Sequence, residues 1–556
     1  MPFSQSPPRP AHGYEGDPLL VELVERLLPA DARGAVEPGL RELGALAAGA
    51  LYDQQLAERH LEPRLVSVDP WGRRVDRIEL TPLWRDAQVL AARHGLVAIP
   101  YERRLGSRSR LHQLAVLLAV EASLDVYSCP LAMSDGAARA ILDTGNRTLA
   151  DRAVSRLLSR DPARAWTSGQ WMTERTGGSD VSRSETVARR DGEGWGLHGT
   201  KWFCSATSSE MALALARPEG GAAGAKGLAL FYLETRAPDG SPNGLEIVRL
   251  KEKLGTRKLP TGEVELRGAR AEPVAGLSGG VRAIAPMLVI TRHWNAMSAC
   301  AGMQRALSLA RDFARRRVAF GAPLEQKPLH DDTHAGLEAE REGALALVAR
   351  GAELLGRAEC GEAAAEEALL LRAIVPLAKL CTGKQAVAIA SEAIECFGGA
   401  GYVEDTGLPR LVRDAQVLPI WEGTTNVLAL DVLRALEVPG ARDAVAAEVR
   451  RAAQTVRDPS LRAPAEAAER AAAHAFAWLA GTDGADPAQA EGGARRFALT
   501  LARALEAALL AAHAQWALDA GKPPRAAAAA RRLARHGLDL VADDADGLAD
   551  TDALTA

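Results

Sequence analysis

The segment from Pro419 to Asn426 places one carboxylate, Glu422, between a tryptophan and a glycine, directly before the amphipathic stretch Val427 to Leu436. A carboxylate in this setting is open enough to react and lies beside apolar surface. Both properties suit a carboxylate that takes part in proton transfer, because the apolar surface can raise its pKa. A surface glutamate at the start of a helix would show the same sequence pattern. From this segment alone, a reactive carboxylate and a surface glutamate are about equally favoured.

Two earlier segments have residues that suit a flat ring or a phosphate. In the loop Trp171 to Val181, a glycine pair precedes Ser179, and the absence of Cβ atoms lets backbone amides and hydroxyls approach a ligand closely. In Gly199 to Ala206, Phe203 could stack on a ring while Ser205 meets its polar edge. A plain glycine-rich connection and a core aromatic are the simpler alternatives.

Two later segments complete the set. Arg315 to Gly321 places basic residues at a predicted helix end, where they suit the helix dipole and could also bind a pyrophosphate. Phe397 to Tyr402 is a glycine-rich turn. Together the five segments resemble the acyl-CoA dehydrogenase superfamily: a TE-x-x-x-GSD loop, a K-W-F-x-S strand, an R-x-x-FG helix end, an FGG-x-GY turn and a final EGT. The segments MTERTGGSDV, GTKWFCSA and PIWEGTTNVLALDVLRAL are most similar to those of the AidB, adaptive alkylation-response branch.

The resemblance implies a role for each matching residue. Glu422 is the expected catalytic base, and Arg292 and Gly423 are expected on the substrate side. The residues expected to bind FAD are Met172, Thr173, Gly178, Ser179, Phe203, Cys204, Ser205, Arg317, Gly398, Thr424 and Asn426. Three positions depart from the common pattern, namely Arg175 for proline, Glu395 for glutamine and Ala319 for threonine. The first two are typical of the AidB-like branch.

The implied activity is FAD-dependent α,β-dehydrogenation of an acyl-CoA thioester by a homotetramer, with an acceptor such as electron-transfer flavoprotein. An oxidase that passes electrons to O2 would carry the same motifs. The alternative from another class is a DNA-binding alkylation-response protein with a largely structural flavin site. From Ala441 to Gly537 there are 14 Lys and Arg against 10 Asp and Glu, and Arg531, Arg532 and Arg535 share one predicted helix face. A solvated helix face is favoured over a DNA surface about two to one.

Around these residues, the periodicity predicts a mainly α fold with a central antiparallel β domain and an additional C-terminal helical domain. The expected domains are residues 1–165 (helical, with no strand), 166–280 (β), 281–438 (helical, with the glutamate) and 439–540 (helical), followed by a disordered acidic tail at 541–556. The apolar run Leu111 to Met133 contains Glu121 and Asp125, so we expect a buried helix there and no membrane span.

The composition is that of an ordinary globular protein, with 556 residues, 47% of them hydrophobic, and a net charge of −4. That charge provides no overall positive field for nucleic acid or anionic membranes. The N-terminal residues lack the pattern of a secretory signal, which predicts a cytoplasmic protein. Six scattered cysteines form no CxxC pair, and the group His330, Asp331, Asp332 and His334 is better explained as a helix start after Pro328 than as a metal site. No metal is expected.

Overall fold

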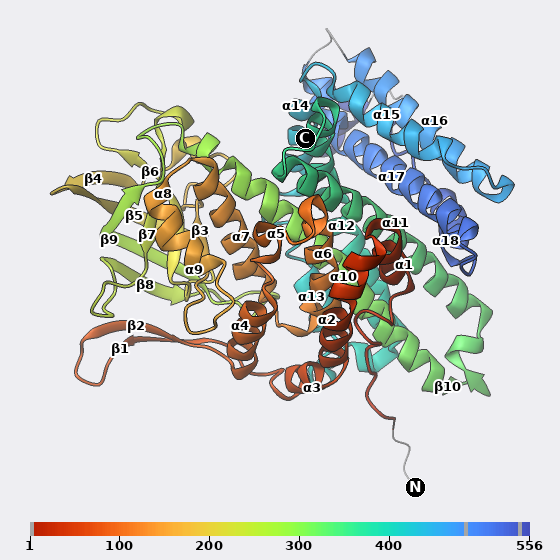
Figure 1. The fold of residues 1–556 in the computed structure, drawn as a ribbon, viewed down its shortest axis with the longest axis horizontal. Coiled ribbons are helices and arrows are strands. Elements are labelled where there is room, and N and C mark those ends of the chain that lie inside the picture. The colour runs from red at the N-terminus through yellow and green to blue at the C-terminus, as the bar shows by residue number, and fades with distance from the viewer. Residues whose placement is uncertain (1–4, 483–486, 543–546) are drawn as a thin grey trace. The chain divides into compact units, whose positions relative to one another are not determined.

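The computed structural model describes residues 5–482, 487–542 and 547–556. The chain forms two compact units, each built from separate stretches (Figure 1). We call Gly49–Arg104 with Val120–Trp294 the sheet unit, and Met1–Ala48 with Leu105–Ala119 and Asn295–Ala556 the helical unit. Each is described by itself.

The sheet unit contains a seven-stranded sheet that closes on itself. Its strands are β3 (Ser168–Trp171), β4 (Val187–Asp191), β5 (Gly194–Ser205), β6 (Met211–Pro218), β7 (Ala229–Glu234), β8 (Leu245–Leu250) and β9 (Thr261–Pro273). Six pair in the order β3-β6-β4-β5-β9-β7, and β8 pairs with β9. Because β7 also pairs with β6, the strands β6, β4, β5, β9 and β7 form a closed ring. The predicted β domain is confirmed, with one refinement: β6 runs parallel to β3 and β4, and the other pairs are antiparallel.

The sheet unit also contains helices. They are α3 (Ala50–Ala57), α4 (Pro82–His94), α5 (Ile99–Glu102), α7 (Ser128–Asp143), α8 (Arg147–Leu149) and α9 (Ser155–Leu157). Helix α7 packs against β3. Its buried Asp135 accepts hydrogen bonds from the hydroxyl of Tyr101 at 2.8 Å and from the indole of Trp294 at 2.8 Å. These hydrogen bonds offset the free-energy cost of burying the carboxylate.

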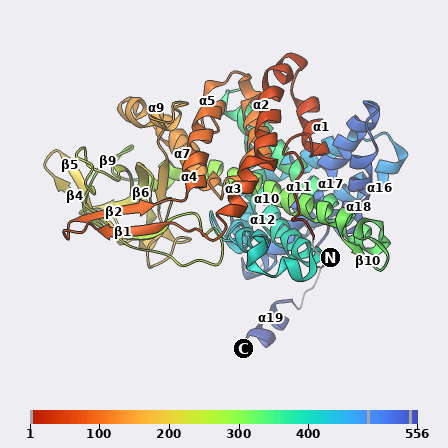
Figure 2. The same cartoon turned by 90° about the horizontal axis from the view of Figure 1, so that it is seen from below.

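The prediction of no strand before residue 166 is wrong. Strands β1 (Arg64–Val68) and β2 (Arg74–Glu79) form an antiparallel hairpin, seen side by side in Figures 1 and 2. The turn is closed by Asp69, whose side chain accepts hydrogen bonds from the backbone N–H groups of Trp71 and Arg73. Leu, Val and Ile residues on both sides of an Asp-Pro-Trp-Gly turn are a weak strand signal, because they do not alternate strictly with polar residues.

The helical unit is built around long, mutually buried helices. Its earlier members are α1 (Pro18–Leu27), α2 (Ala30–Ala48), α6 (Ser109–Val120), α10 (Gly280–Arg316), α11 (Pro328–Glu359), α12 (Ala365–Cys396), α13 (Arg410–Ala415) and α14 (Thr425–Leu436). The division between the two units falls inside α10 and at the end of α6. The apolar run Leu111 to Met133 is two helices, α6 and α7, rather than one, because a 3-10 turn at Glu121–Ser123 interrupts it.

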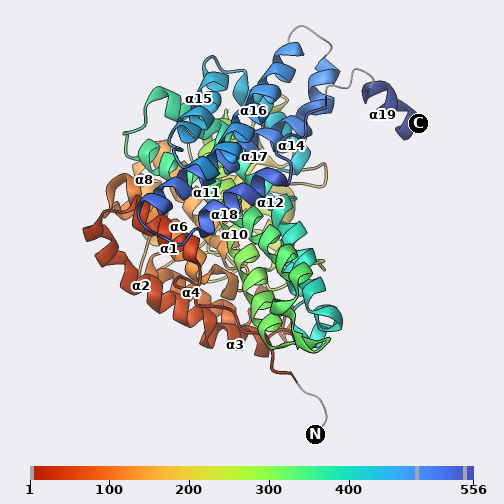
Figure 3. The same cartoon turned by 90° about the vertical axis from the view of Figure 1, so that its right-hand side faces the viewer.

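The residues after 439 form helices, as predicted. They are α15 (Ala441–Gln454), α16 (Pro459–Gly481), α17 (Pro487–Asp519) and α18 (Arg525–Arg535). Helix α17 packs against α11, α12, α14, α15, α16 and α18 (Figure 3). The acidic tail differs from the predicted disorder, since Gly547–Thr555 forms helix α19 from Ala, Leu and Asp residues. Residues 543–546 lie outside the described part of the chain.

Two of the described helices, α12 and α17, are long and apolar enough to cross a membrane by length and composition alone. In both, 83% of the most apolar window is buried inside the protein. This burial is what the core helices of a packed bundle show.

Candidate active site

Glu422 lies in a tight turn directly before α14, within the helical unit. Its φ is +57° and that of Gly423 is +108°, so two consecutive residues occupy the left-handed region. A non-glycine residue pays roughly 1–2 kcal/mol for that conformation, which persists only where the surroundings enforce it. The Glu422 side chain is partly exposed, as a general base must be to reach a substrate.

The residues after the glutamate start a helix and are held from the C-terminal region. Thr424 is the N-cap residue of α14, and its side chain makes no capping hydrogen bond. Asn426 is exposed, and its Oδ1 accepts a hydrogen bond from Arg495 of α17 at 3.4 Å. Helix α17 therefore reaches the segment where the resemblance expects cofactor contacts.

The predicted cofactor residues Arg317 and Gly398 are linked through two aromatic rings of the helical unit. Phe313, one helical turn before Arg317, packs edge-on against Phe397 with ring centroids 5.2 Å apart. Gly398 follows Phe397 with φ of +58°, and a Cβ on Gly401 would lie 2.0 Å from the carbonyl oxygen of Ile394. The FGG-x-GY turn therefore requires glycine at both positions.

In the sheet unit, the predicted loop and strand are joined directly. The backbone N–H of Trp202 donates to the carbonyl of Thr173 at 3.0 Å. A Cβ on Gly178 would lie 2.4 Å from Oγ1 of Thr173, so glycine is needed where the loop folds back. Met172 is partly buried and Ser179 is exposed.

A buried ion pair that the sequence reasoning missed fixes this junction. Nζ of Lys201 lies 2.7 Å from Oε1 of Glu174, with the two side chains 0% and 3% exposed. The carboxylate also accepts bonds from the hydroxyl of Thr186 at 2.6 Å and the backbone N–H of Glu185 at 2.6 Å. Burial alone would raise the pKa of Glu174, but Lys201 and these hydrogen bonds lower it overall.

Strand β5 presents Phe203 and buries its neighbours. Phe203 is 54% exposed, whereas Cys204 is 1% exposed and belongs to the core of the sheet. A register shift between Lys201 and Cys204 breaks the alternation that would place Lys201 and Phe203 on one face. The thiol of Cys204 therefore packs in the core of the sheet. Burial also raises the pKa of that thiol.

Cations surround the aromatic residues of this strand. The guanidinium of Arg175 lies 5.2 Å from the ring centroid of Trp202, and the ammonium of Lys251 lies 3.8 Å from the same ring and 4.6 Å from that of Phe203. Such contacts stabilise both partners. The departure from proline at position 175 is thus accounted for by a cation-π contact.

The structure brings the predicted residues together in two sets. The helical unit holds Glu422 and Gly423 with Thr424 and Asn426 in one turn, and links Arg317 with Gly398. The sheet unit joins Thr173 and Gly178 to the strand of Phe203 and Ser205 and also contains Arg292, partly buried on α10.

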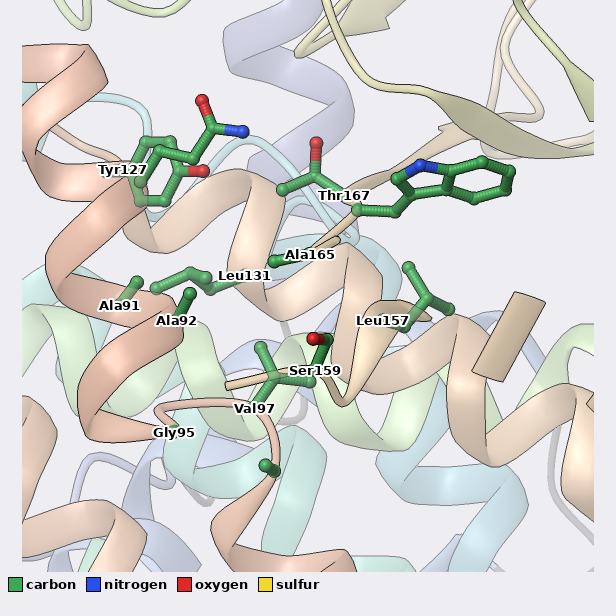
Figure 4. A pocket seen from close by; sticks show the side chains of 13 residues that line it. Ala91, Ala92, Gly95, Val97, Tyr127, Leu131, Leu157, Ser159, Ala165 and Thr167 are labelled. Atoms are coloured by element: carbon green, nitrogen blue, oxygen red, sulfur yellow. The ribbon is translucent and has the colours of Figure 1, made fainter. Parts of the chain in front are cut away.

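A separate small pocket, open to solvent, lies in the sheet unit, where Tyr127, Leu131 and Thr167 line it (Figure 4). Alanines 91 and 92 of α4 form another side. None of the predicted site residues lines it. Among the described residues, no group of three or more His, Cys, Asp or Glu side chains could hold a metal ion.

Family models match three consecutive parts of the chain. They are the adaptive response protein AidB N-terminal domain at residues 5–162, the acyl-CoA dehydrogenase middle domain at 169–269 and the acyl-CoA dehydrogenase C-terminal domain at 278–437. This chain belongs to the acyl-CoA dehydrogenase family. Its N-terminal match identifies it, more narrowly, as an AidB-like member. Both assignments confirm the resemblance seen in the sequence.

The relatives cover two thirds or more of the chain. Acyl-CoA dehydrogenase family member 11 of Caenorhabditis elegans is 42% identical over 530 residues, 92% of this chain and 86% of that protein. AidB of Escherichia coli strain K12 is 36% identical over 385 residues, 67% of this chain and 69% of that protein. The crystal structure of Caenorhabditis elegans ACDH-11 in complex with C11-CoA superimposes with a TM-score of 0.95 at 39% identity, covering 100% of this chain and 96% of that one.

Two of the three arginines considered for DNA binding, Arg531 and Arg532, have partners within the protein, as does Arg525 on the same helix. Arg525 lies 2.9 Å from Glu338 and 2.7 Å from Glu342, and Arg532 pairs with Asp332. Arg531 donates to the hydroxyl of Ser460 at 3.3 Å, and Arg535 is exposed. Arg525 and Arg532 of α18 pair with carboxylates of α11, so much of the positive charge of α18 is neutralised within the protein. The DNA alternative is not favoured.

Proposed function

We propose that this protein oxidises an acyl-CoA thioester to the 2-enoyl thioester, with Glu422 as the base. The left-handed turn that presents a partly exposed Glu422, in a chain of the acyl-CoA dehydrogenase family, carries this proposal. The complex of the Caenorhabditis elegans relative with C11-CoA supports an acyl-CoA substrate.

FAD is the proposed cofactor, and the side chains of the sheet unit suit it. The half-exposed ring of Phe203 can cover a flat heteroaromatic, while Ser179 and the Cβ-free backbone at Gly178 can approach its polar edge and phosphates. Arg317, Gly398, Thr424 and Asn426 are the proposed cofactor residues of the helical unit. When bound, FAD supplies the acceptor for the β-hydride and a hydroxyl for the substrate carbonyl.

The remaining chemistry belongs to the chain. A hydrogen beside a thioester carbonyl is only weakly acidic, so its removal needs a base and stabilisation of the charge that develops on oxygen. The carboxylate of Glu422 removes the α-proton, and the backbone N–H of Glu422 donates a hydrogen bond to the carbonyl oxygen. Arg292 and Gly423 are the proposed substrate-side residues.

The test is an anaerobic titration of the purified yellow protein with a panel of acyl-CoA thioesters. We expect bleaching of the flavin absorbance in the wild type. In Glu422→Gln we expect unchanged flavin content and a rate lower by roughly 100-fold or more. Glu437→Gln, an exposed glutamate just after α14, is the matched control and should behave as wild type. Full turnover in Glu422→Gln would exclude Glu422 as the base.

Two further properties are proposed from the resemblance, a homotetramer and reoxidation by an acceptor such as electron-transfer flavoprotein. A cytoplasmic location is also proposed. Phe320 and Val318 follow α10, and their side chains are 99% and 58% exposed. Large apolar side chains that are exposed side by side support self-association. Light scattering tests the assembly. Peroxide release during turnover without an added acceptor would instead identify an oxidase.

A further inference from the structure

The turn at Glu422 needs contacts that hold its backbone in place, because Glu422 is a residue other than glycine with a positive φ. One side of the turn is held from α10. The indole N–H of Trp421 donates to Oδ1 of Asn295, and Nδ2 of the same asparagine donates to the carbonyl of Leu418 at 3.3 Å. These bonds fix the chain before Glu422 and leave open what fixes the chain after it.

The other side is held by Lys379, which lies in the middle of α12. Its side chain is 0% exposed, and Nζ donates to the carbonyl of Gly423 at 2.5 Å. One turn further along α12, a Cβ on Gly383 would lie 3.2 Å from the carbonyl oxygen of Leu418 and the nitrogen of Pro419. Helix α12 therefore runs directly beneath the turn and supports both of its ends.

A buried ammonium group is costly, and a short hydrogen bond from a charged donor is stronger than a neutral one. The bond from Lys379 also has a directional consequence. The described peptide bonds are all trans, so when the Gly423 carbonyl points to Lys379, the N–H of Thr424 points the opposite way. One side chain thus sets the orientation of the peptide group between Gly423 and Thr424, one residue beyond the glutamate.

We propose that Lys379 is a positioning residue for proton abstraction. By holding the Gly423 carbonyl against α12, it keeps the left-handed turn in the form that presents the Glu422 carboxylate and backbone N–H to the substrate. This inference rests on the proposed function and assigns a role to a residue that lies outside the substrate and cofactor contacts.

The test compares Lys379→Met, which keeps the length of the side chain and removes its donor, with Lys379→Gln, which keeps a neutral donor. Lys384→Met is the matched control, because Lys384 lies on the same helix and is exposed. Flavin content and melting temperature are measured first. All variants that fold are then assayed for turnover and for proton abstraction alone.

Proton abstraction is isolated with 3,3-dimethylbutanoyl-CoA in D2O, because this thioester has α-hydrogens and no β-hydrogen to transfer. Exchange of its α-hydrogens is followed by mass spectrometry. For Lys379→Met we expect exchange and kcat to fall roughly 10- to 100-fold, the range for a hydrogen bond from a charged group, with KM within about threefold of wild type. Lys379→Gln should recover part of the loss, and Lys384→Met should match wild type.

The outcomes separate the two proposals. No exchange and no bleaching in the wild type would remove the proposed function and this inference with it. Wild-type exchange that persists undiminished in a folded Lys379→Met variant would overturn the role of Lys379 and leave the function intact. A loss expressed only in KM, or failure of both Lys379 variants to fold, would show that the lysine serves binding or global stability, which also overturns the proposal.

Discussion

Replacing Lys201 by methionine would leave the carboxylate of Glu174 buried without its cation. The pair is completely enclosed, and Nζ of Lys201 also donates to the carbonyl of Leu215 at 2.7 Å. Removing one partner of such a pair costs about 3–5 kcal/mol, because the remaining charge has no partner in a medium that solvates it poorly. For a unit the size of the sheet unit, that loss corresponds to a fall in melting temperature of about 6–20 °C.

Differential scanning fluorimetry measures this effect, with Lys226→Met as the control because Lys226 is exposed in the same unit. The double variant Glu174→Gln/Lys201→Met should recover part of the loss, since it buries no uncompensated charge. Thr173 and Trp202 flank the pair, so we also expect weaker FAD retention in the single variant. A melting temperature for Lys201→Met within about 2 °C of the control would refute the reasoning, as would a double variant less stable than the single one.

The pH dependence of this contribution follows from the lowered pKa of Glu174. A carboxyl group with a folded-state pKa below its ordinary value adds stability above that ordinary value, near 4.5, and loses it as pH falls through the folded-state pKa. The difference in melting temperature between wild type and Glu174→Gln should therefore be constant near neutrality and shrink below pH 4.5.

The remaining predictions concern the helical unit. Gly423→Ala should lose activity and stability, by about 1–2 kcal/mol, because φ is +108° and the added Cβ would lie 3.0 Å from Leu428; denaturant titration and turnover measure both. Burial raises the pKa of Glu506 to about 8, so wild type should lose stability as pH rises from near 4.5 through 8, and Glu506→Gln should melt higher than wild type at pH 9 but not at pH 6. A DNA column should show no salt-sensitive retention that disappears in Arg531→Ala/Arg532→Ala/Arg535→Ala, because two of these arginines are engaged within the protein.

The sequence predicts the order of helices and strands because long apolar periods are local signals. It also identifies Glu422 as the candidate base, since the tryptophan, the glycine and the amphipathic helix that mark this glutamate are its neighbours along the chain. It could not predict that Lys201 turns into the core, because that depends on a β-bulge that places one extra residue in β5 between Lys201 and Cys204. Cys204 packs on the side opposite to Phe203 because neighbouring residues of a strand point to opposite faces.

Residues that act across long separations were missed for a different reason. Lys379 and Asn295 are far from Glu422 in sequence, and only the packing of α10 and α12 brings them to the turn. A signal was present for Lys379, since a single lysine inside the apolar run IVPLAKLCTG requires a buried partner. The partner itself, a backbone carbonyl, leaves no trace in the sequence. The domain boundaries expected from composition stay a prediction.

The packing of α17 among six other helices sets an order of events during synthesis. A ribosome that has reached residue 438 has released α11 and α12, but the helix that covers them has not yet been made. Until Asp519 emerges, their apolar faces are open to water and to other nascent chains. We therefore expect truncation before α17 to give aggregates rather than a smaller enzyme, and the growing chain to depend on a holdase for the interval.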